Sequence, residues 1–262
     1  MIRRQLSLIL SLLVCQFGFA QTSTDSSKIF KVLSFNILHG ATTRGDFDLD
    51  AIAKVIVDTD PDLVALQEVD NKTRRAQNYD LATELGWRTK MNPLFARAMP
   101  YDGGEYGEAV LSKYSFISTR NVPLPFSPGN EPRAALEVTI CVDGDTISFV
   151  GTHLDHTEDE SDRIAQAKAL NAAFENNQYP TLLVGDLNAL PESIPILTLK
   201  EKWAVSDTAN PPANTYPSGI PIKKIDYVMY RPIDKWKVLE TKIINDTIAS
   251  DHCALLVTIK RL

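Results

Sequence analysis

The chain has 262 residues, of which 44% are hydrophobic and 23% are charged, and it contains 12 glycines and 15 prolines. This composition is typical of a globular protein and excludes collagen-like, coiled-coil and wholly disordered chains. Asp and Glu outnumber Lys and Arg by 33 to 27, which gives a net charge of −6. Such a chain offers no broad basic surface, so any polyanionic partner must be bound by local groups.

The N-terminus has the order of a secretory signal peptide over 1–20. Arg3 and Arg4 precede an apolar stretch, and small residues at the end of that stretch mark a cleavage site after Ala20. The stretch is shorter than the roughly 20 residues that a membrane-spanning helix needs. We therefore expect a secreted or periplasmic protein with no membrane-spanning segment after cleavage. A lipid anchor on Cys15 is less favoured, because a bulky valine precedes that cysteine.

Short runs rich in β-branched residues recur through the rest of the chain and predict eight strands. Helical patterns interleave with them without a break, so we expect one domain over 30–262 after a flexible polar lead-in at 21–29. The predicted strands cover residues 31–35, 63–66, 109–111, 134–140, 146–150, 181–184, 225–230 and 253–259.

Three amphipathic patterns predict helices over 49–57, 80–85 and 158–177. The last is the longest, and Thr157 and Glu160 have the spacing of a capping box at its start. Helices of this kind bury their apolar stripe against a sheet, which agrees with the interleaved pattern of elements.

Three further segments are expected to be surface loops that shape a substrate-binding rim. Two of them, 123–132 and 211–221, are rich in proline. The third, 92–105, is the best candidate for specificity and carries only Arg97 as a cation.

The two cysteines that would remain after signal cleavage, Cys141 and Cys253, both lie in apolar runs. We therefore expect two buried free thiols, while export of the protein would also permit a disulfide between them. The sequence contains neither a CxxC motif nor a zinc-type spacing of Cys and His.

Polar residues with catalytic chemistry lie at the ends of the predicted strands. Asn36 and Glu68 follow the first two strands, and Asp226 opens the seventh. Loops at strand ends can bring such side chains together in one cleft. The same placement holds for His153, Asp155, Asp186, Asn188, Asp251 and His252.

These residues lie in seven short motifs, which in chain order are Ser34-Phe35-Asn36, Gln67-Glu68-Val69, Gly107-Glu108-Ala109-Val110-Leu111-Ser112, Thr152-His153-Leu154-Asp155, Gly185-Asp186-Leu187-Asn188, Ile225-Asp226-Tyr227 and Ser250-Asp251-His252. Their order resembles that of the endonuclease/exonuclease/phosphatase superfamily, over nearly the whole mature chain. This group includes pancreatic-type deoxyribonucleases, abasic-site endonucleases, bacterial sphingomyelinases and inositol polyphosphate 5-phosphatases. The resemblance implies an α+β fold, a four-layer αββα sandwich of two packed, mostly antiparallel mixed sheets flanked by helices.

The resemblance also implies a divalent cation. It makes Glu68 the principal metal ligand, with Asn36 and Asp251 close by, and hard oxygen ligands suit Mg²⁺, Mn²⁺ or Ca²⁺. From the residues alone, a solvated residue that ends a strand is the favoured interpretation of Glu68, and a turn cap is the alternative for Asn36.

A phosphodiester resists hydrolysis because its anionic oxygens repel a nucleophile, so the site needs a cation, a base and charge-stabilising donors. In the family, the residue at Asp186 orients or deprotonates the water, and the residue at Asn188 donates to a phosphate oxygen. His252 and Asp226 resemble the family's imidazole and carboxylate pair, in which the acid fixes the ring tautomer. His252 would act either as a base toward water or as a cationic clamp on the phosphate.

His153 resembles the second imidazole of the family, which donates to the phosphate or to the leaving oxygen. Many relatives carry asparagine where this chain has Glu108, whereas deoxyribonuclease-type members place a glutamate there that bonds to the histidine. We hypothesise that Glu108 orients His153, and the alternative is a surface glutamate at a strand start. Arg133 is a candidate for bidentate binding of a phosphate, with a surface salt bridge as the alternative.

The sequence thus predicts a metal-dependent phosphoesterase that most readily cleaves a phosphodiester by in-line attack of water. The substrate would be a nucleic acid, a lipid headgroup or a small phosphate ester, and no stable protein partner is implied. A phosphomonoesterase acting on an inositol, sugar or lipid phosphate is the alternative enzyme. A noncatalytic binding module on the same fold is the alternative of another class, but no motif position carries an apolar replacement.

Overall fold

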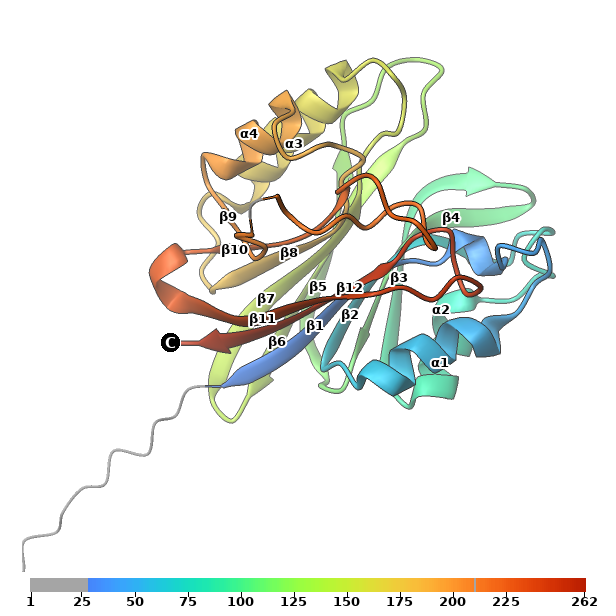
Figure 1. Ribbon diagram of the computed structural model, residues 1–262, viewed down its shortest axis with the longest axis horizontal. Coiled ribbons are helices and arrows are strands. Elements are labelled where there is room, and N and C mark those ends of the chain that lie inside the picture. The colour runs from blue at the N-terminus through green and yellow to red at the C-terminus, as the bar shows by residue number, and fades with distance from the viewer. Residues whose placement is uncertain (1–27, 210) are drawn as a thin grey trace, which may run out of the picture.

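The computed structural model describes residues 28–209 and 211–262, and in this part of the chain two six-stranded sheets pack face to face between helices (Figure 1). The predicted four-layer αββα sandwich is confirmed, and both sheets are mixed as expected. The predicted signal peptide, 1–20, and most of the lead-in at 21–29 lie outside the described residues. Within the described residues, no helix is both long and apolar enough to cross a membrane.

The first sheet has the strand order β11-β12-β1-β2-β4-β3. Its β1 and β2 are parallel, and every other neighbouring pair is antiparallel. In spatial order the strands are β11 (Trp236–Ile244), β12 (Ala254–Arg261), β1 (Ile29–Asn36), β2 (Leu63–Asn71), β4 (Gly104–Ser112) and β3 (Asn92–Tyr101).

The second sheet has the order β5-β6-β7-β8-β10-β9, and again one pair, β7 and β8, is parallel. Each parallel pair is joined through a crossover helix, as parallel strands require. In spatial order the strands are β5 (Phe116–Leu124), β6 (Arg133–Val142), β7 (Asp145–His153), β8 (Thr181–Asp186), β10 (Asp226–Arg231) and β9 (Ala204–Val205).

Helices cover the two outer faces (Figure 1). The first sheet carries α1 (Leu49–Thr59) and α2 (Leu81–Thr89), and the second carries α3 (Ser161–Phe174) and α4 (Ile194–Lys200). Two short 3₁₀ helices, η1 (Leu38–Gly40) and η2 (Ile233–Lys235), follow β1 and precede β11.

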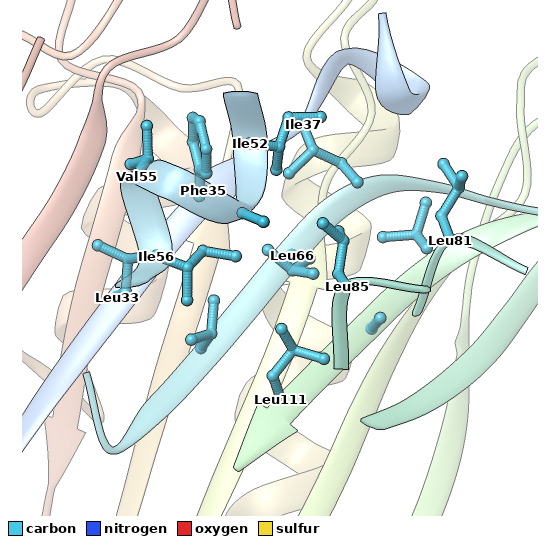
Figure 2. Packing of buried hydrophobic residues seen from close by; sticks show 14 of the residues in the cluster. Leu33, Phe35, Ile37, Ile52, Val55, Ile56, Leu66, Leu81, Leu85 and Leu111 are labelled. Carbon is cyan, nitrogen blue, oxygen red and sulfur yellow. The ribbon is translucent and has the colours of Figure 1, made fainter. Parts of the chain in front are cut away.

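The inner strands are buried on both faces. Leu33 and Phe35 of β1 pack under α1 and α2 (Figure 2), whereas Val32, just before Leu33, faces the other sheet. In β8, Leu183 packs under α3 and α4 and Val184 faces the first sheet. Strands buried on both sides read as continuous apolar runs rather than as alternating ones, which is why the sequence reveals them.

The start of α3 differs from the prediction. The helix begins at Ser161 rather than at 158, and Glu160 makes no capping hydrogen bond through its side chain. Instead, the Asp159 carboxylate accepts the Ser161 amide at 2.9 Å. The hydroxyl of Thr157 donates to Asp155, so it does not serve the helix. The predicted capping box is therefore wrong, because an aspartate closer to the helix satisfies its free amides.

Four strands were not predicted, and each of them is an edge strand: β3, β5, β9 and β11. Segment 92–105, expected to be a specificity loop, is mostly β3 and its hairpin turn into β4. Its prolines, Pro93 and Pro100, are tolerated because an edge strand leaves backbone groups unpaired. Edge strands are half exposed, so they lack the apolar run that marks an inner strand.

Both cysteines are free, and Cys253 is buried as expected. Cys141 is exposed, which corrects the prediction of two buried thiols. It lies one residue before the end of β6, beside the turn into β7, where the apolar run of the strand runs out.

Candidate active site

The carboxyl ends of β1, β2, β7 and β8 meet the start of β10 and the segment before β12 around one pocket of about 540 Å³. Asn36 and Asp226 bond to residues in its lining, and Glu108 is fully buried nearby. Asp155 is also buried and does not line the pocket. The other seven residues singled out from the sequence line the pocket itself: Glu68, Arg133, His153, Asp186, Asn188, Asp251 and His252.

Strand register brings the centre of this pocket together. Asp186 ends β8 and is the register partner of His153 in parallel β7 and of Asp226 in antiparallel β10. The preceding Gly185 allows the close approach of β7, because a Cβ there would lie 1.8 Å from the carbonyl oxygen of Thr152. Any side chain at this position would push β8 away from β7 and separate His153 from Asp186.

Three residues at the pocket adopt left-handed backbone that is uncommon outside glycine: His39 (φ 46°), Glu68 (φ 56°) and Asn188 (φ 48°). Glu68 lies where the register of β2 against β4 shifts between Leu66 and Val69. Bulges next to active sites often re-aim a side chain, and this one brings Glu68 into the pocket lining.

Glu68 is held as a carboxylate by its neighbours. Asn36 Nδ2 donates to Oε1 at 3.1 Å, and His39 Nδ1 lies 3.4 Å from Oε2. Burial alone would raise the pKa of Glu68, but the hydrogen bonds with His39 and Asn36 oppose it, and the pKa is lowered to about 2. An ionised hard-oxygen ligand at the pocket wall fits a dication such as Mg²⁺.

Asn36 bridges the two carboxylates of the centre. Its Nδ2 also lies 3.3 Å from Asp186 Oδ2, while its Oδ1 accepts the amide of Leu38 at 3.1 Å. In this orientation Asn36 acts as a donor that sets the spacing of Glu68 and Asp186. Its predicted role beside a metal ion stays a prediction, as does that of Asp251, which lines the same pocket.

His252 lies between two buried carboxylates, those of Asp226 and Asp186. His252 Nδ1 lies 3.1 Å from Asp226 Oδ2, and its Nε2 lies 3.6 Å from Asp186 Oδ2. Burial by itself lowers the pKa of His252, but the carboxylates of Asp226 and Asp186 raise it to about 10. Burial also raises the pKa of Asp186, against the opposing effect of His252. A protonated His252 suits the cationic clamp, and a more basic Asp186 suits proton acceptance.

His153 is in a different state from His252. Burial and the guanidinium of Arg133 lower the pKa of His153 well below its usual value, so the ring is neutral. Arg133 Nη1 lies 3.1 Å from His153 Nδ1, and a guanidinium can only donate. Nδ1 therefore accepts, which places the ring proton on Nε2. This nitrogen lies 3.5 Å from Asp186 Oδ2, an acceptor, and 2.9 Å from Asn188 Nδ2, which is itself a donor and does not pair with it in this tautomer.

The expected bond between Glu108 and His153 is not formed. Both carboxylate oxygens of Glu108 are buried and have no hydrogen-bond partner among the described residues. Burial raises the pKa of Glu108 well above its usual value, which favours the neutral acid, and the buried position corrects the alternative of a surface glutamate. Arg133 instead donates to His153 Nδ1. Arg133 is itself buried, and it pairs with Glu131 at 2.9 Å. The alternative of a surface salt bridge for Arg133 is therefore also wrong.

The sequence did not single out several other lining residues. His39 contacts Glu68, and the Tyr216 ring centroid lies 4.8 Å from that of His252. Tyr106 and Arg75 also line the pocket. Tyr106 directly precedes the Gly107-Glu108 motif, which was the available signal for it, whereas nothing local distinguishes Arg75 from Arg74.

The profile of the Endonuclease/Exonuclease/phosphatase family matches residues 33–252, so the chain belongs to this family. Members are generally hydrolytic phosphoesterases that use divalent metals. The fold is similar to that of a functionally unknown conserved protein from Enterococcus faecalis, with 24% identity, a TM-score of 0.74, and coverage of 88% of this chain and 100% of that one.

Two further solved structures share the fold. A mannosyl-6-phosphatase from Bacteroides thetaiotaomicron has 16% identity and a TM-score of 0.71, over 88% of this chain and 99% of that one. The human Nocturnin catalytic domain with a bound sulfate anion has 18% identity and a TM-score of 0.69, over 89% of this chain and 95% of that one. At these identities the likeness concerns the fold.

Proposed function

We propose that the protein is a secreted or periplasmic, divalent-metal-dependent phosphoesterase that hydrolyses a phosphodiester. The observation that carries this proposal is the position of Asp186, whose Oδ2 lies 3.5 Å from His153 Nε2 and 3.6 Å from His252 Nε2 in a pocket that Glu68 also lines. One basic carboxylate between a neutral and a charged imidazole supplies a proton acceptor and two donors around one phosphate.

The residues divide the work as follows. Asp186 orients water and takes its proton, His252 stabilises the negative charge that develops on the phosphate, and His153 donates from Nε2. A cation held by Glu68, with Asn36 and Asp251, would act as a Lewis acid toward the phosphate oxygens. Asp226 keeps the His252 ring protonated and oriented.

The charge of the pocket supports a diester over a monoester. A diester carries one negative charge near neutral pH, whereas a monoester approaches two because its second pKa is about 6. Glu68, Asp186 and Asp251 already line the pocket and repel the more highly charged group. A sugar phosphomonoester is the second candidate, favoured by the limited volume of the pocket, about 540 Å³. The proposed export of the protein is a separate point and is supported by the signal-peptide pattern over residues 1–20.

The test is hydrolysis of bis-p-nitrophenyl phosphate by the purified mature chain with Mg²⁺ or Mn²⁺. We expect turnover that EDTA abolishes and that readded Mg²⁺ or Mn²⁺ restores. The variant that combines Asp186→Asn with His252→Ala serves as the control, and it should be inactive while its circular dichroism is unchanged.

Activity that survives both EDTA and the double variant would contradict the proposal, because it would belong to a contaminant or to another site. Faster hydrolysis of p-nitrophenyl phosphate than of the diester would instead favour the second candidate.

A further inference from the structure

Arg75 enters the pocket from the segment after β2 and is unusually well held for a partly exposed side chain. Its Nε and Nη2 donate to the two carboxylate oxygens of Asp70 at 2.7 and 2.9 Å. Asp70 is fully buried, whereas the Arg75 side chain is 30% exposed. Among the described residues, no hydrogen bond engages Nη1 of Arg75. The bidentate pair with Asp70 thus fixes the Arg75 guanidinium at the pocket lining, and its Nη1 remains a donor that no group of the described residues uses.

Two tyrosine rings form a platform beside this guanidinium. The Arg75 guanidinium carbon lies 4.5 Å from the centroid of Tyr101 and 5.6 Å from that of Tyr106. The guanidinium carbon of Arg133, which contacts His153, lies 6.0 Å from the same Tyr106 ring. The Tyr106 ring alone thus separates the Arg75 guanidinium from that of Arg133, which contacts His153.

The pocket lining does not favour a second anion near Arg75. Each arginine in the lining is paired with carboxylates: Arg75 with Asp70, Arg133 with Glu131, and Arg163 with both Asp155 and Glu160. Five carboxylate side chains line the pocket against four arginines and lysines and the protonated His252, so the lining carries no excess of positive charge. An arginine whose charge is balanced by a carboxylate still donates hydrogen bonds. A guanidinium next to aromatic rings therefore suits a sugar, whose hydroxyl groups accept hydrogen bonds and whose C–H groups pack on the rings.

We propose that Arg75 selects diesters in which the alcohol that stays on the phosphate after hydrolysis is a neutral polyol such as a sugar. Asp70 holds Arg75 in place, and Tyr101 and Tyr106 flank it. The inference rests on the proposed phosphodiesterase and adds its substrate class. Arg75 is then a specificity-determining residue that contacts sugar hydroxyls, while Asp186 and His252 act on the phosphate.

The experiment compares two diesters with the same p-nitrophenolate leaving group, one esterified to the 6-hydroxyl of glucose and the other to ethanol. We expect kcat/KM to be higher for the glucose diester. Arg75→Met should lower it roughly 10- to 100-fold, the effect of losing hydrogen bonds to a charged donor, and leave the ethyl diester within about 2-fold. Arg75→Lys should also lose the preference, because an ammonium lacks the fork.

Arg74→Met is the matched control. Arg74 is the neighbouring residue, is 76% exposed and pairs with Asp102, and it does not line the pocket. This variant should keep the preference for the glucose diester. The rate on the ethyl diester reports whether each variant is folded.

Three results would overturn the inference. The first is an equal kcat/KM of the wild type for both diesters, and the second is an equal loss of kcat/KM on both diesters in Arg75→Met. The third is an Arg75-dependent preference for a glucose diester that carries a second phosphate. If neither diester is hydrolysed, the proposed function fails by itself. Calorimetric binding of glucose 6-(methyl phosphate) to Asp186→Asn, with and without Arg75→Met, then decides the inference, and equal affinities would reject it.

Discussion

The centre of the pocket and its rim are built in different ways. His153, Asp186 and Asp226 of the centre are at most 3% exposed and lie at strand ends whose register places them together. The rim residues Arg75 and Tyr101 are 30% and 39% exposed and come from a loop and from the edge strand β3.

Under the proposed function, this difference separates the residues that act on the phosphate from those that select the alcohol. At the centre, burial and mutual charge set the protonation of each group, so one substitution there should change the whole reaction. At the rim, ion pairs hold donors in place without changing their protonation, so a substitution should change which alcohol is accepted. The predictions below test this division from the largest expected effect to the smallest.

Asp186→Asn should abolish nearly all turnover. The amide keeps the shape of the side chain but cannot take a proton from water, and a general base contributes about 10²- to 10⁴-fold. We expect kcat on bis-p-nitrophenyl phosphate to fall about 10³-fold, measured at saturating metal. The control is Asp234→Asn, whose side chain is 74% exposed. A fall of less than 10-fold would remove Asp186 from the role of base.

Glu68→Gln should raise the metal requirement. Loss of the only charge on this side chain weakens a hard-cation site, and we expect the Mg²⁺ concentration for half-maximal rate to rise at least about 10-fold. A metal titration of the rate measures this, with partial rescue at high Mg²⁺. Glu201→Gln, an exposed change at the end of α4, should leave the titration unchanged. An unaltered metal requirement in Glu68→Gln would contradict its assignment.

The pH profile of kcat should have two limbs that belong to the centre. The pKa of Asp186 is raised, so the rate should fall on acidification as this carboxylate takes up a proton. The pKa of His252 is raised to about 10, so its positive charge is lost only as the pH rises through that value. Glu68, with a pKa of about 2, stays ionised throughout. An optimum below about pH 5 would contradict this assignment.

Glu108→Gln should change stability more than turnover. The pKa of Glu108 is raised in the folded chain, so the unfolded chain binds fewer protons above about pH 4.3 and folding stability falls as pH rises. Gln cannot ionise, so the variant should melt above the wild type at pH 8 and at the same temperature at pH 4, as measured by thermal unfolding.

Because Arg133 rather than Glu108 occupies Nδ1 of His153, kcat of this variant should stay within about 3-fold of the wild type. Unchanged turnover would remove the hypothesis that Glu108 orients His153. A much larger loss of kcat would restore that hypothesis.

All eight strands predicted from the sequence are inner strands, and the four that were missed are edges. Burial on both faces forces an uninterrupted apolar run, which a sequence displays, whereas an edge such as β3 tolerates prolines and polar residues. The candidate site residues could be picked out of the sequence because their motifs lie mostly at the ends of inner strands, and the structure gathers them in and around one pocket.

The tertiary structure alone decided which group neighbours which. Residues distant in sequence come together where Arg133 contacts His153 and where Arg75 lines the pocket. The same packing leaves Glu108 buried without a hydrogen-bond partner among the described residues. Local patterns carry information about burial, because burial depends on the side chain itself. Protonation and hydrogen-bond partners depend on what lies across the fold, and no local pattern of residues encodes that.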